Sequence, residues 1–441
     1  MTPAGSLNGF IIAAPSSGSG KTFLTLSLLH AFRTRGQKVG SFKVGPDYID
    51  PGFHTAASGR PCINLDPWAM RAETIRNNLI TTIDGCNLVI GEGVMGLFDG
   101  AAGGDNSTAD LAEIIGFPIV LVVDASGQAA SAAALVHGFA EYRPTVNLAG
   151  VIFNRVGGPR HHDMLLSAMA DRPTPVFGCV PRNPDLTLPK RHLGLVLAGE
   201  HIGLEAFLER AAAHVAENID LNALAALSIR PPSFRGNKSP PIPPLGQRIA
   251  VAQDDAFAFA YPHVLNGWRE AGAAIETFSP LANEVLPECD AIYLPGGYPE
   301  LHAATLSNNQ NFINGLRTAA KKQIPIFGEC GGYMVLGKGL IDAEGNRHSM
   351  SGLLPLETSF AKRRLHLGYR DAVLSTKMPF GAEGNRFRGH EFHYATVLRE
   401  DGDEPVFTCW DSMGNSLCNF GRRVGSVSGS FLHLIDRQDK A

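Results

Sequence analysis

The sequence contains no paired cysteine motif, no long apolar run and no large excess of either charge. Its seven cysteines, an odd number, are scattered along 441 residues without a CxxC pair, which argues against a disulfide framework and against a zinc site. No apolar run approaches the roughly 18–20 residues that a bilayer-spanning helix needs, and the first residues lack the basic segment of a secretion signal. We therefore expect a soluble protein of the reducing cytoplasm.

A formal net charge of −4 gives no electrostatic reason to expect nucleic acid or an anionic membrane as a partner. Hydrophobic residues make up 44% and charged residues 18% of the chain, which is typical of a globular rather than a disordered protein. A chain of this length can form two or three domains, each with a sizeable core.

Short apolar runs alternate with helix-like stretches through the first half of the chain. These runs are continuous, as is typical of strands that helices cover on both faces. We therefore predict an α/β domain with a parallel sheet over residues 1–228. Its predicted strands are GFIIAA, VGSFKV, NLVIGE, PIVLVVD, NLAGVIF and TPVFGCV.

Residues 229–246 are rich in proline and poor in apolar side chains, so we predict an inter-domain linker there. The alternation of strands and helices restarts with RIAVAQD, and residues 247–441 form a second predicted α/β domain. Its stretch 349–432 has shorter, glycine-rich segments, which we interpret as an antiparallel addition to the second sheet.

The segment APSSGSGKT follows the first predicted strand and opens a predicted helix, which is the context of a phosphate-binding P-loop. Its glycines allow backbone N–H groups to turn toward an anion, its lysine adds charge for the β- and γ-phosphates, and its threonine hydroxyl suits Mg²⁺. Pro15 stands where the usual motif has its first glycine, and a turn without function is the alternative interpretation. The predicted ATP-binding residues of the loop are Gly18, Ser19, Gly20, Lys21 and Thr22.

Acidic residues follow two further strands. FKVGPDYIDP offers Lys43, Asp47 and Asp50, and GEGVMGLFDG offers Glu92 and Asp99. Carboxylates at the carboxyl ends of parallel strands point into the crevice where ligands bind, and such oxygen ligands suit Mg²⁺. We expect Lys43 to stabilise charge during phosphoryl transfer. Asp50 and Asp99 are candidates for substrate binding or catalysis, with turn formation as the alternative interpretation.

A further strand, in VIFNRVG, ends with Asn154. The side-chain amide of this residue can read the edge of an adenine, so we include Asn154 among the candidate ATP-binding residues. A strand-end cap is the alternative interpretation.

The stretch IPIFGECGGYMVLG places one cysteine in a tight turn between a predicted strand and a predicted helix, which indicates a nucleophile elbow. A helix N-terminus at Gly331 would lower the pKa of the Cys330 thiol and supply an N–H group to an oxyanion hole. The candidate base is His433 in SGSFLH. A second oxyanion donor would come from Gly296 or Gly297 in LPGGYPE. A buried cysteine without a catalytic role is the alternative.

The segment RGHEFHY gathers four polar candidates into seven residues: Arg388, His390, Glu391 and His393. Alternation along a strand places His390 on the face opposite Glu391 and His393. The spacing matches no settled metal site, so we disfavour zinc and interpret the segment as candidate substrate-binding or catalytic residues. An edge strand with solvated charges is the alternative.

Two chemical activities follow from these motifs. A thiol that attacks an amide carbonyl can release ammonia, and an ATP site can convert a carboxylate into an acyl phosphate that ammonia captures. The phosphorylation is needed because oxide would otherwise be the leaving group. Together the motifs predict a glutamine- and ATP-dependent amide synthesis.

This set of motifs resembles the cobyrinic acid a,c-diamide synthase family. PSSGSGKT, FKVGPDYIDPGFH, GEGVMGLFDG, VAQDDAFAFAY, LPGGYPE, FGECGGYM, RGHEFHY and SGSFLH occur in the family's order over nearly the whole chain. The family resembles dethiobiotin synthetase in its first domain and class I, triad-type glutamine amidotransferases in its second. The resemblance implies ATP- and Mg²⁺-dependent amidation of the a and c side-chain carboxylates of a corrin precursor in cobalamin biosynthesis.

The resemblance also implies roles for single residues. The lysine and threonine of the P-loop would hold phosphate and metal together with Lys43, and Asp47 and Glu92 would bind Mg²⁺. Cys330 and His433 would carry out the glutaminase chemistry. Triad-type glutaminases commonly carry a glutamate two residues after the histidine, where this chain has isoleucine, so the third group is either missing or supplied from elsewhere.

No single motif distinguishes the two ring substrates, but the overall sequence resembles the aerobic branch of the family, which implies metal-free hydrogenobyrinic acid rather than the cobalt-containing cobyrinic acid. We expect ATP, glutamine and this corrin precursor as ligands, a homodimer as a candidate assembly, and neither nucleic acid nor a membrane as a partner. The alternatives are a cobyric acid synthase that amidates other carboxylates of the ring, a Ni-sirohydrochlorin diamide synthase and, from another class, a partition-type P-loop ATPase switch.

Overall fold

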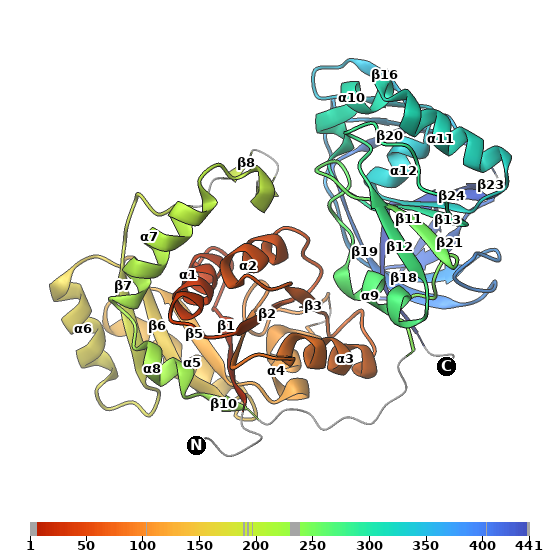
Figure 1. Cartoon of the computed structure of the whole chain (residues 1–441). Helices are drawn as coiled ribbons and strands as arrows, with labels where there is room; N and C mark the ends of the chain where they lie inside the picture. Colours follow the sequence, from red (N-terminus) through yellow and green to blue (C-terminus); the bar gives the residue numbers. More distant parts are fainter. Residues whose placement is uncertain are drawn as a thin grey trace. The chain divides into compact units, whose positions relative to one another are not determined.

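The computed structural model describes residues 7–102, 104–187, 190–191, 194–195, 197–229, 239–402 and 404–438. The chain forms two compact units, one of residues 1–68 and 75–236 and the other of residues 69–74 and 237–441 (Figure 1). Both are α/β units with a parallel sheet, which confirms the predicted fold class. Half of the predicted linker, residues 230–238, lies outside the described residues.

The first unit is built on an eight-stranded sheet with the order β3-β2-β4-β1-β5-β6-β7, in which β10 pairs antiparallel with β1 and the other pairs are parallel. The strands are β1 (Leu7–Ala13), β2 (Val39–Val44), β3 (Ile63–Leu65), β4 (Leu88–Glu92), β5 (Ile119–Asp124), β6 (Leu148–Val156), β7 (Val176–Pro181) and β10 (Ser228–Ile229). A short hairpin of β8 (Lys190–Arg191) and β9 (Gly194–Leu195) follows β7.

Helices cover this sheet because its strands are apolar on both faces. They are α1 (Lys21–Thr34), α2 (Asp50–Ser58), α3 (Ala72–Ile83), α4 (Thr108–Ile115), α5 (Ala130–Tyr142), α6 (Pro159–Met169), η1 (Ala198–Glu200), α7 (Leu204–Ala216) and α8 (Leu221–Ala225). Helix α1 packs against both α2 and α7 on one side of the sheet (Figure 1). The core between them includes Phe10, Leu28 and Ile152, all of which are fully buried.

The second unit has a six-stranded sheet with the order β12-β11-β13-β14-β24-β23, in which β23 alone pairs antiparallel. Its strands are β11 (Arg248–Ala252), β12 (Ala274–Phe278), β13 (Ala291–Leu294), β14 (Ile326–Glu329), β23 (Arg422–Val424) and β24 (Val427–Ser430). Its helices are α9 (Pro262–Glu270), η2 (Pro299–His302), α10 (Ala303–Asn308), α11 (Gln310–Lys321) and α12 (Gly331–Leu336).

The stretch 349–432 does not simply extend this sheet, so that interpretation was wrong in part. Strands β22 (Ser416–Phe420), β21 (Phe407–Trp410), β18 (His366–Leu374), β19 (Arg386–His393) and β25 (Leu432–Arg437) form a separate antiparallel sheet in that order. Strands β16 (Arg347–Ser349), β15 (Gly339–Ile341), β17 (Leu356–Ser359) and β20 (Thr396–Glu400) form another. Only β23 and β24 join the six-stranded sheet. The prediction failed because glycine-rich strands show too little alternation of polar and apolar residues to indicate which strand they pair with.

Among the described residues, no helix combines the length and hydrophobicity that crossing a membrane requires.

Among the described glycines of the second unit, Gly332 at the start of α12 has the least room for a side chain. A Cβ atom on Gly332 would lie 2.0 Å from the backbone oxygen of Leu294 on β13. We expect Gly332→Ala to lower the free energy of unfolding by about 1–3 kcal/mol, measured by scanning calorimetry. Gly138→Ala is the matched control, since a Cβ there meets nothing within 4 Å; it should be neutral or stabilising. An unchanged unfolding temperature for Gly332→Ala would contradict this packing.

Candidate active sites

The phosphate loop connects β1 to α1, as the sequence predicts. Gly18 and Gly20 have φ angles of 82° and 97°, in the left-handed region that favours glycine. The Lys21 ammonium donates to the backbone oxygens of Ser16 (3.3 Å) and Met95 (2.5 Å), so it lies close over the loop. Burial lowers the pKa of Lys21 to about 8, and an anion bound at the loop would favour its charged form.

A cluster of Thr22, Lys43, Asp50 and Glu92, here called the buried ion cluster, lies beside the loop. Lys43 on β2 and Glu92 on β4 are neighbours in the parallel register. Lys43 Nζ lies 2.8 Å from Glu92 Oε1 and 2.5 Å from Asp50 Oδ2. The Thr22 hydroxyl donates to Glu92 Oε1 at 2.6 Å and lies 3.5 Å from Asp50 Oδ2. Three oxygen-bearing side chains and one ammonium group therefore meet at the start of α1.

Opposite charges hold this cluster ionised despite its burial. Burial by itself would lower the pKa of Lys43, but Asp50 and Glu92 outweigh it and raise that pKa. Burial would raise the pKa of Glu92, but Lys43 and His54 outweigh it and lower that pKa. Burial and the neighbouring Asp47 raise the pKa of Asp50 to about 6 although Lys43 opposes them. Asp50 is therefore the carboxyl group of the cluster that titrates closest to neutral pH.

His54 is a functional candidate to which the sequence analysis gave no role. Its Nε2 atom lies 2.7 Å from Glu92 Oε2, and its Nδ1 atom lies 3.5 Å from the sulfur of Cys62. Burial lowers the pKa of His54, but Cys62 and Glu92 outweigh it and raise the pKa to about 10. The available signal was helical spacing, because His54 follows Asp50 by four residues on α2 and so lies on the same face.

Two other carboxylates of the sequence prediction, Asp47 and Asp99, bond to backbone N–H groups of turns and not to the buried ion cluster. Asp47 Oδ1 accepts hydrogen bonds from the backbone N–H groups of Ile49 and Asp50, both at 2.9 Å, at the start of α2. Asp99 Oδ2 accepts one from the N–H group of Gly96 at 2.9 Å. The structure therefore brings Asp50, rather than Asp47, to the buried ion cluster.

A cavity of about 860 Å³ opens beside the loop and the buried ion cluster, a size typical of small-molecule sites. Asn154 and Arg155, at the end of β6, also line it. The Asn154 amide donates to the backbone oxygen of Ser19 at 2.9 Å, so it fixes the loop, and its contact with adenine stays a prediction. Arg155, which the sequence analysis missed, has a φ angle of 58°, a strained conformation that is common at functional sites.

The predicted elbow lies where β14 meets α12. Cys330 has φ 46° and ψ −104°, which is unusual for any residue with a side chain. Its backbone N–H donates to the oxygen of Ser430 at 2.8 Å, and the Gly332 N–H donates to the oxygen of Pro295 at 3.1 Å. The Cys330 sulfur lies 3.6 Å from the backbone oxygen of Phe392. These contacts hold the strained turn of a nucleophile elbow.

The glycines after β13 face this elbow. A Cβ atom on Gly331 would lie 3.0 Å from the backbone nitrogen of Gly297, so the two predicted oxyanion donors are neighbours. A Cβ atom on Gly296 would lie 3.2 Å from Cys330 Cβ and 3.2 Å from His433 Nε2. Glycine is required here because the thiol and the imidazole border the same small space.

His433 on β25 is fully buried and pairs with His390 of β19 in the sheet register. Burial lowers the pKa of His433 to about 3; His390 and His393 lower it further, while Glu391 opposes them. The imidazole is therefore neutral and can accept a proton. Its Nδ1 atom lies 4.0 Å from Glu329 Oε2, a carboxylate to which the sequence analysis gave no role.

The predicted lowering of the Cys330 thiol pKa is wrong. Burial raises this pKa, Glu300 adds to the shift, and the N–H group of Gly331 opposes it only in part. Helix α12 has only six residues, and so short a helix contributes little dipole. The thiol is therefore protonated, and a base must take its proton during the attack.

The residues of RGHEFHY lie on β19. Glu391 accepts hydrogen bonds from Arg370 Nε at 2.9 Å and Nη2 at 2.6 Å, and lies 3.0 Å from His393 Nε2. Glu391 and His393 therefore share one face, as strand alternation predicts. Arg388 lies opposite Asp436 of β25 in the register.

Candidate ligand atoms of His366, Glu391 and His393 lie within 4.8 Å of one another. The Arg370 guanidinium already compensates the charge of Glu391, so a cation would have to displace it.

Two family models match the chain, one in each half. The CobQ/CobB/MinD/ParA nucleotide binding domain matches residues 10–196, and the CobB/CobQ-like glutamine amidotransferase domain matches residues 248–441. The chain thus joins a nucleotide-binding domain to a glutamine amidotransferase domain, the combination that the sequence predicts.

Curated relatives match over nearly the full length. The hydrogenobyrinate a,c-diamide synthase of Brucella abortus biovar 1 (strain 9-941) is 52% identical over 438 residues, which are 99% of this chain and 100% of the relative. Proteins of the same name from Rhizobium meliloti (strain 1021) and Mesorhizobium japonicum are 52% and 50% identical, over 98% and 97% of this chain and 99% and 98% of their own. The chain therefore belongs to the hydrogenobyrinate a,c-diamide synthase family, as its motifs indicate.

Proposed function

We propose that this protein is a ligase that converts the a and c carboxylates of hydrogenobyrinic acid into amides in cobalamin biosynthesis, with ATP as activator and glutamine as nitrogen donor. The observation that carries the proposal is the presence in one chain of a Cys–His elbow and of a P-loop beside a lysine–carboxylate cluster. The names of the full-length relatives support this ring and these positions.

The release of nitrogen uses the elbow. As the Cys330 sulfur attacks the carboxamide carbon of glutamine, its proton passes to His433 Nε2, and the N–H groups of Gly297 and Gly331 stabilise the oxyanion. Collapse of the intermediate returns this proton to the leaving nitrogen and expels ammonia. Water then hydrolyses the remaining thioester to glutamate.

The capture of nitrogen uses the first unit. An oxygen of the corrin carboxylate attacks the γ-phosphorus of ATP, giving an acyl phosphate and ADP. Lys21 and Lys43 hold the phosphate oxygens and compensate the charge that develops on them. Ammonia then attacks the acyl carbon, and phosphate leaves.

Magnesium fits the oxygen atoms of the buried ion cluster. The hydroxyl of Thr22 and the carboxylates of Glu92 and Asp50 are hard ligands that lie together, which is what Mg²⁺ prefers. When bound, the ion neutralises charge on the phosphate oxygens. Asp47 contributes indirectly, since it holds the start of the helix that carries Asp50.

The predicted cytoplasmic location, the homodimer, and the lack of nucleic-acid and membrane partners stay predictions.

The proposal is tested by incubating the purified protein with ATP, Mg²⁺ and glutamine and with hydrogenobyrinic or cobyrinic acid, followed by mass spectrometry. We expect two successive conversions of acid to amide on the metal-free ring, coupled to ATP hydrolysis, at the a and c positions. Amidation at other carboxylates would indicate a cobyric acid synthase, and absence of ammonia release would favour an ATPase switch.

Cys330→Ser should lower glutamine-dependent amidation by at least about 10³-fold, because the hydroxyl is a far weaker nucleophile. Amidation with free ammonia should continue, since the first unit needs no thiol. Both rates are read from the amide product. Cys289→Ser, a half-buried cysteine before β13, serves as control and should behave like the wild type. Loss of both activities in Cys330→Ser would contradict separate sites.

Glu92→Gln should lower ATP-dependent amidation by about 10²-fold or more, because it removes a charge that faces Lys43 and Thr22. Glutamine hydrolysis without ATP should persist, and ammonia release measures it. Asp50→Asn should act in the same direction.

Asp47→Asn provides the matched comparison. Asparagine keeps the side-chain oxygen that caps the start of α2, so this variant should retain most of the activity. A loss of activity as large as that of Asp50→Asn would indicate that Asp47 binds the metal as well.

A further inference from the structure

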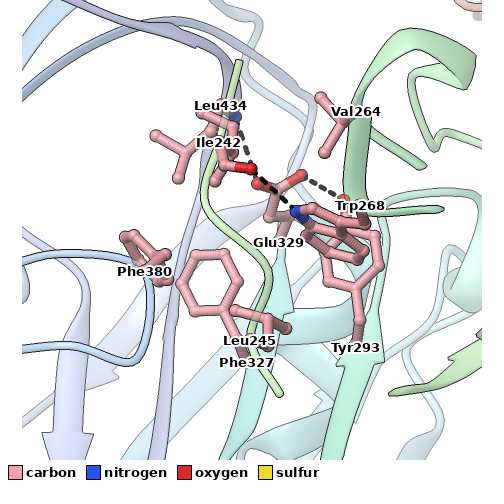
Figure 2. Close-up of a pocket in the computed structure, with 9 residues that line it drawn as sticks. All are labelled: Ile242, Leu245, Val264, Trp268, Tyr293, Phe327, Glu329, Phe380 and Leu434. Carbon is pink, nitrogen blue, oxygen red and sulfur yellow. Dashed lines mark hydrogen bonds between the residues drawn. The ribbon is translucent and has the colours of Figure 1, made fainter. Parts of the chain in front are cut away.

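The glutaminase site contains a buried carboxylate that has no role in the mechanism above. Glu329 ends β14 and directly precedes Cys330. Its Oε2 atom accepts a hydrogen bond from the Tyr293 hydroxyl at 2.7 Å, and its Oε1 atom accepts one from the backbone N–H of Leu434 at 3.1 Å. Figure 2 shows the carboxylate between these two donors, which come from β13 and β25.

The surroundings of Glu329 are otherwise apolar. Phe327, Phe380 and Trp268 line the same narrow cavity (Figure 2), whose volume of about 10 Å³ is close to that of a single water site. The Trp268 indole N–H is directed elsewhere, to the oxygen of Ile242 at 3.0 Å. Burying a carboxylate here is unfavourable, so a purely structural role would be served as well by a neutral side chain.

His433 lies between this carboxylate and the thiol. Its Nε2 atom borders Gly296 on the side of Cys330, and its Nδ1 atom lies 4.0 Å from Glu329 Oε2. A nucleophile, an imidazole and a carboxylate thus follow one another as in a hydrolytic triad. The distance is longer than a hydrogen bond, and such contacts commonly shorten only when substrate is bound.

We infer that Glu329 is the positioning residue of His433, the third member of the glutaminase triad, held in place by Tyr293 and the Leu434 N–H. It would accept the Nδ1–H of His433, so that the unprotonated Nε2 takes the Cys330 proton, and it would stabilise the imidazolium that results. This inference rests on the proposed glutaminase activity.

The electrostatics agree with this role. Burial raises the pKa of Glu329 to about 7, while the hydrogen bonds from Tyr293 and Leu434 oppose the shift. The carboxylate is therefore ionised above about pH 7 and protonated below it. Other titratable groups also face the site. Tyr261 acts on Tyr293, and three residues of β19 shift the pKa of His433: His390, Glu391 and His393.

A second carboxylate, Glu391, also acts on His433. It is already bound by Arg370 and lies 3.0 Å from His393 Nε2. These partners compensate its charge and fix its orientation, so Glu329 is the better candidate.

The test is Glu329→Gln in the full-length protein. A glutamine amide is isosteric, and its oxygen and nitrogen can keep both neighbours hydrogen-bonded, so the fold should persist. We expect kcat for glutamine hydrolysis to fall about 100-fold with KM unchanged. The wild-type rate should rise with pH through about 7, and the variant should lose this rise. Ammonia-dependent amidation should stay at the wild-type level.

Tyr293→Phe is the second variant. It removes one hydrogen-bond donor to the carboxylate, so the rise in rate should move to higher pH.

The matched control for Glu329→Gln is Glu276→Gln, at an exposed glutamate on β12. It should behave like the wild type.

A separate readout needs no glutamine. Alkylation of Cys330 by iodoacetamide, followed by mass spectrometry, reports transfer of the thiol proton to His433. In the wild type the alkylation rate should change as Glu329 ionises through about pH 7, and Glu329→Gln should lose this step. If the wild type releases no ammonia, the proposed function fails, whereas this labelling still tests Glu329. Wild-type kcat, pH profile and labelling in Glu329→Gln, or the same changes in Glu391→Gln instead, would overturn the inference.

Discussion

Parallel strands end at the same edge of their sheet, and both active sites depend on this constraint. In the first unit the register sets Lys43 of β2 beside Glu92 of β4. In the second unit Gly296 follows β13, Cys330 follows β14, and Ser430 ends β24 in register with the residue before the cysteine. Segments far apart in the chain therefore contribute one or two residues each to a common site.

The two sites treat buried charge in opposite ways. In the nucleotide-binding unit, Lys43 and Glu92 compensate each other and stay ionised, which suits the binding of phosphate and metal. In the amidotransferase unit, burial shifts the pKa values of Cys330 and His433 toward their neutral forms. Neutral groups can exchange protons during a reaction, and no charge has to be kept in an apolar environment in the resting state.

The parts that sequence reasoning predicted well are contiguous. The P-loop and the elbow each consist of a strand, a tight turn and a helix, so a few neighbouring residues carry the whole signal. The harder parts depend on contacts between segments. Asp47 and Asp50 lie only three positions apart, and the geometry at the start of α2 decides that Asp50 joins the ions while Asp47 accepts backbone N–H groups. The antiparallel strands of the second unit were predicted, but their assembly into separate sheets was missed for a similar reason.

The sequence by itself determined the two domain types and the family, and it indicated the candidate nucleophile and base, because each rests on short motifs with a local physical signal. Only the tertiary structure decided which carboxylate faces the base. The usual position, two residues after His433, holds Ile435, and that absence is visible in the sequence. The replacement, Glu329, reaches His433 only because β25 passes beside the end of β14, where the Leu434 N–H donates to that carboxylate. Local patterns do not encode such a contact, since strand register is fixed by the packing of the whole sheet.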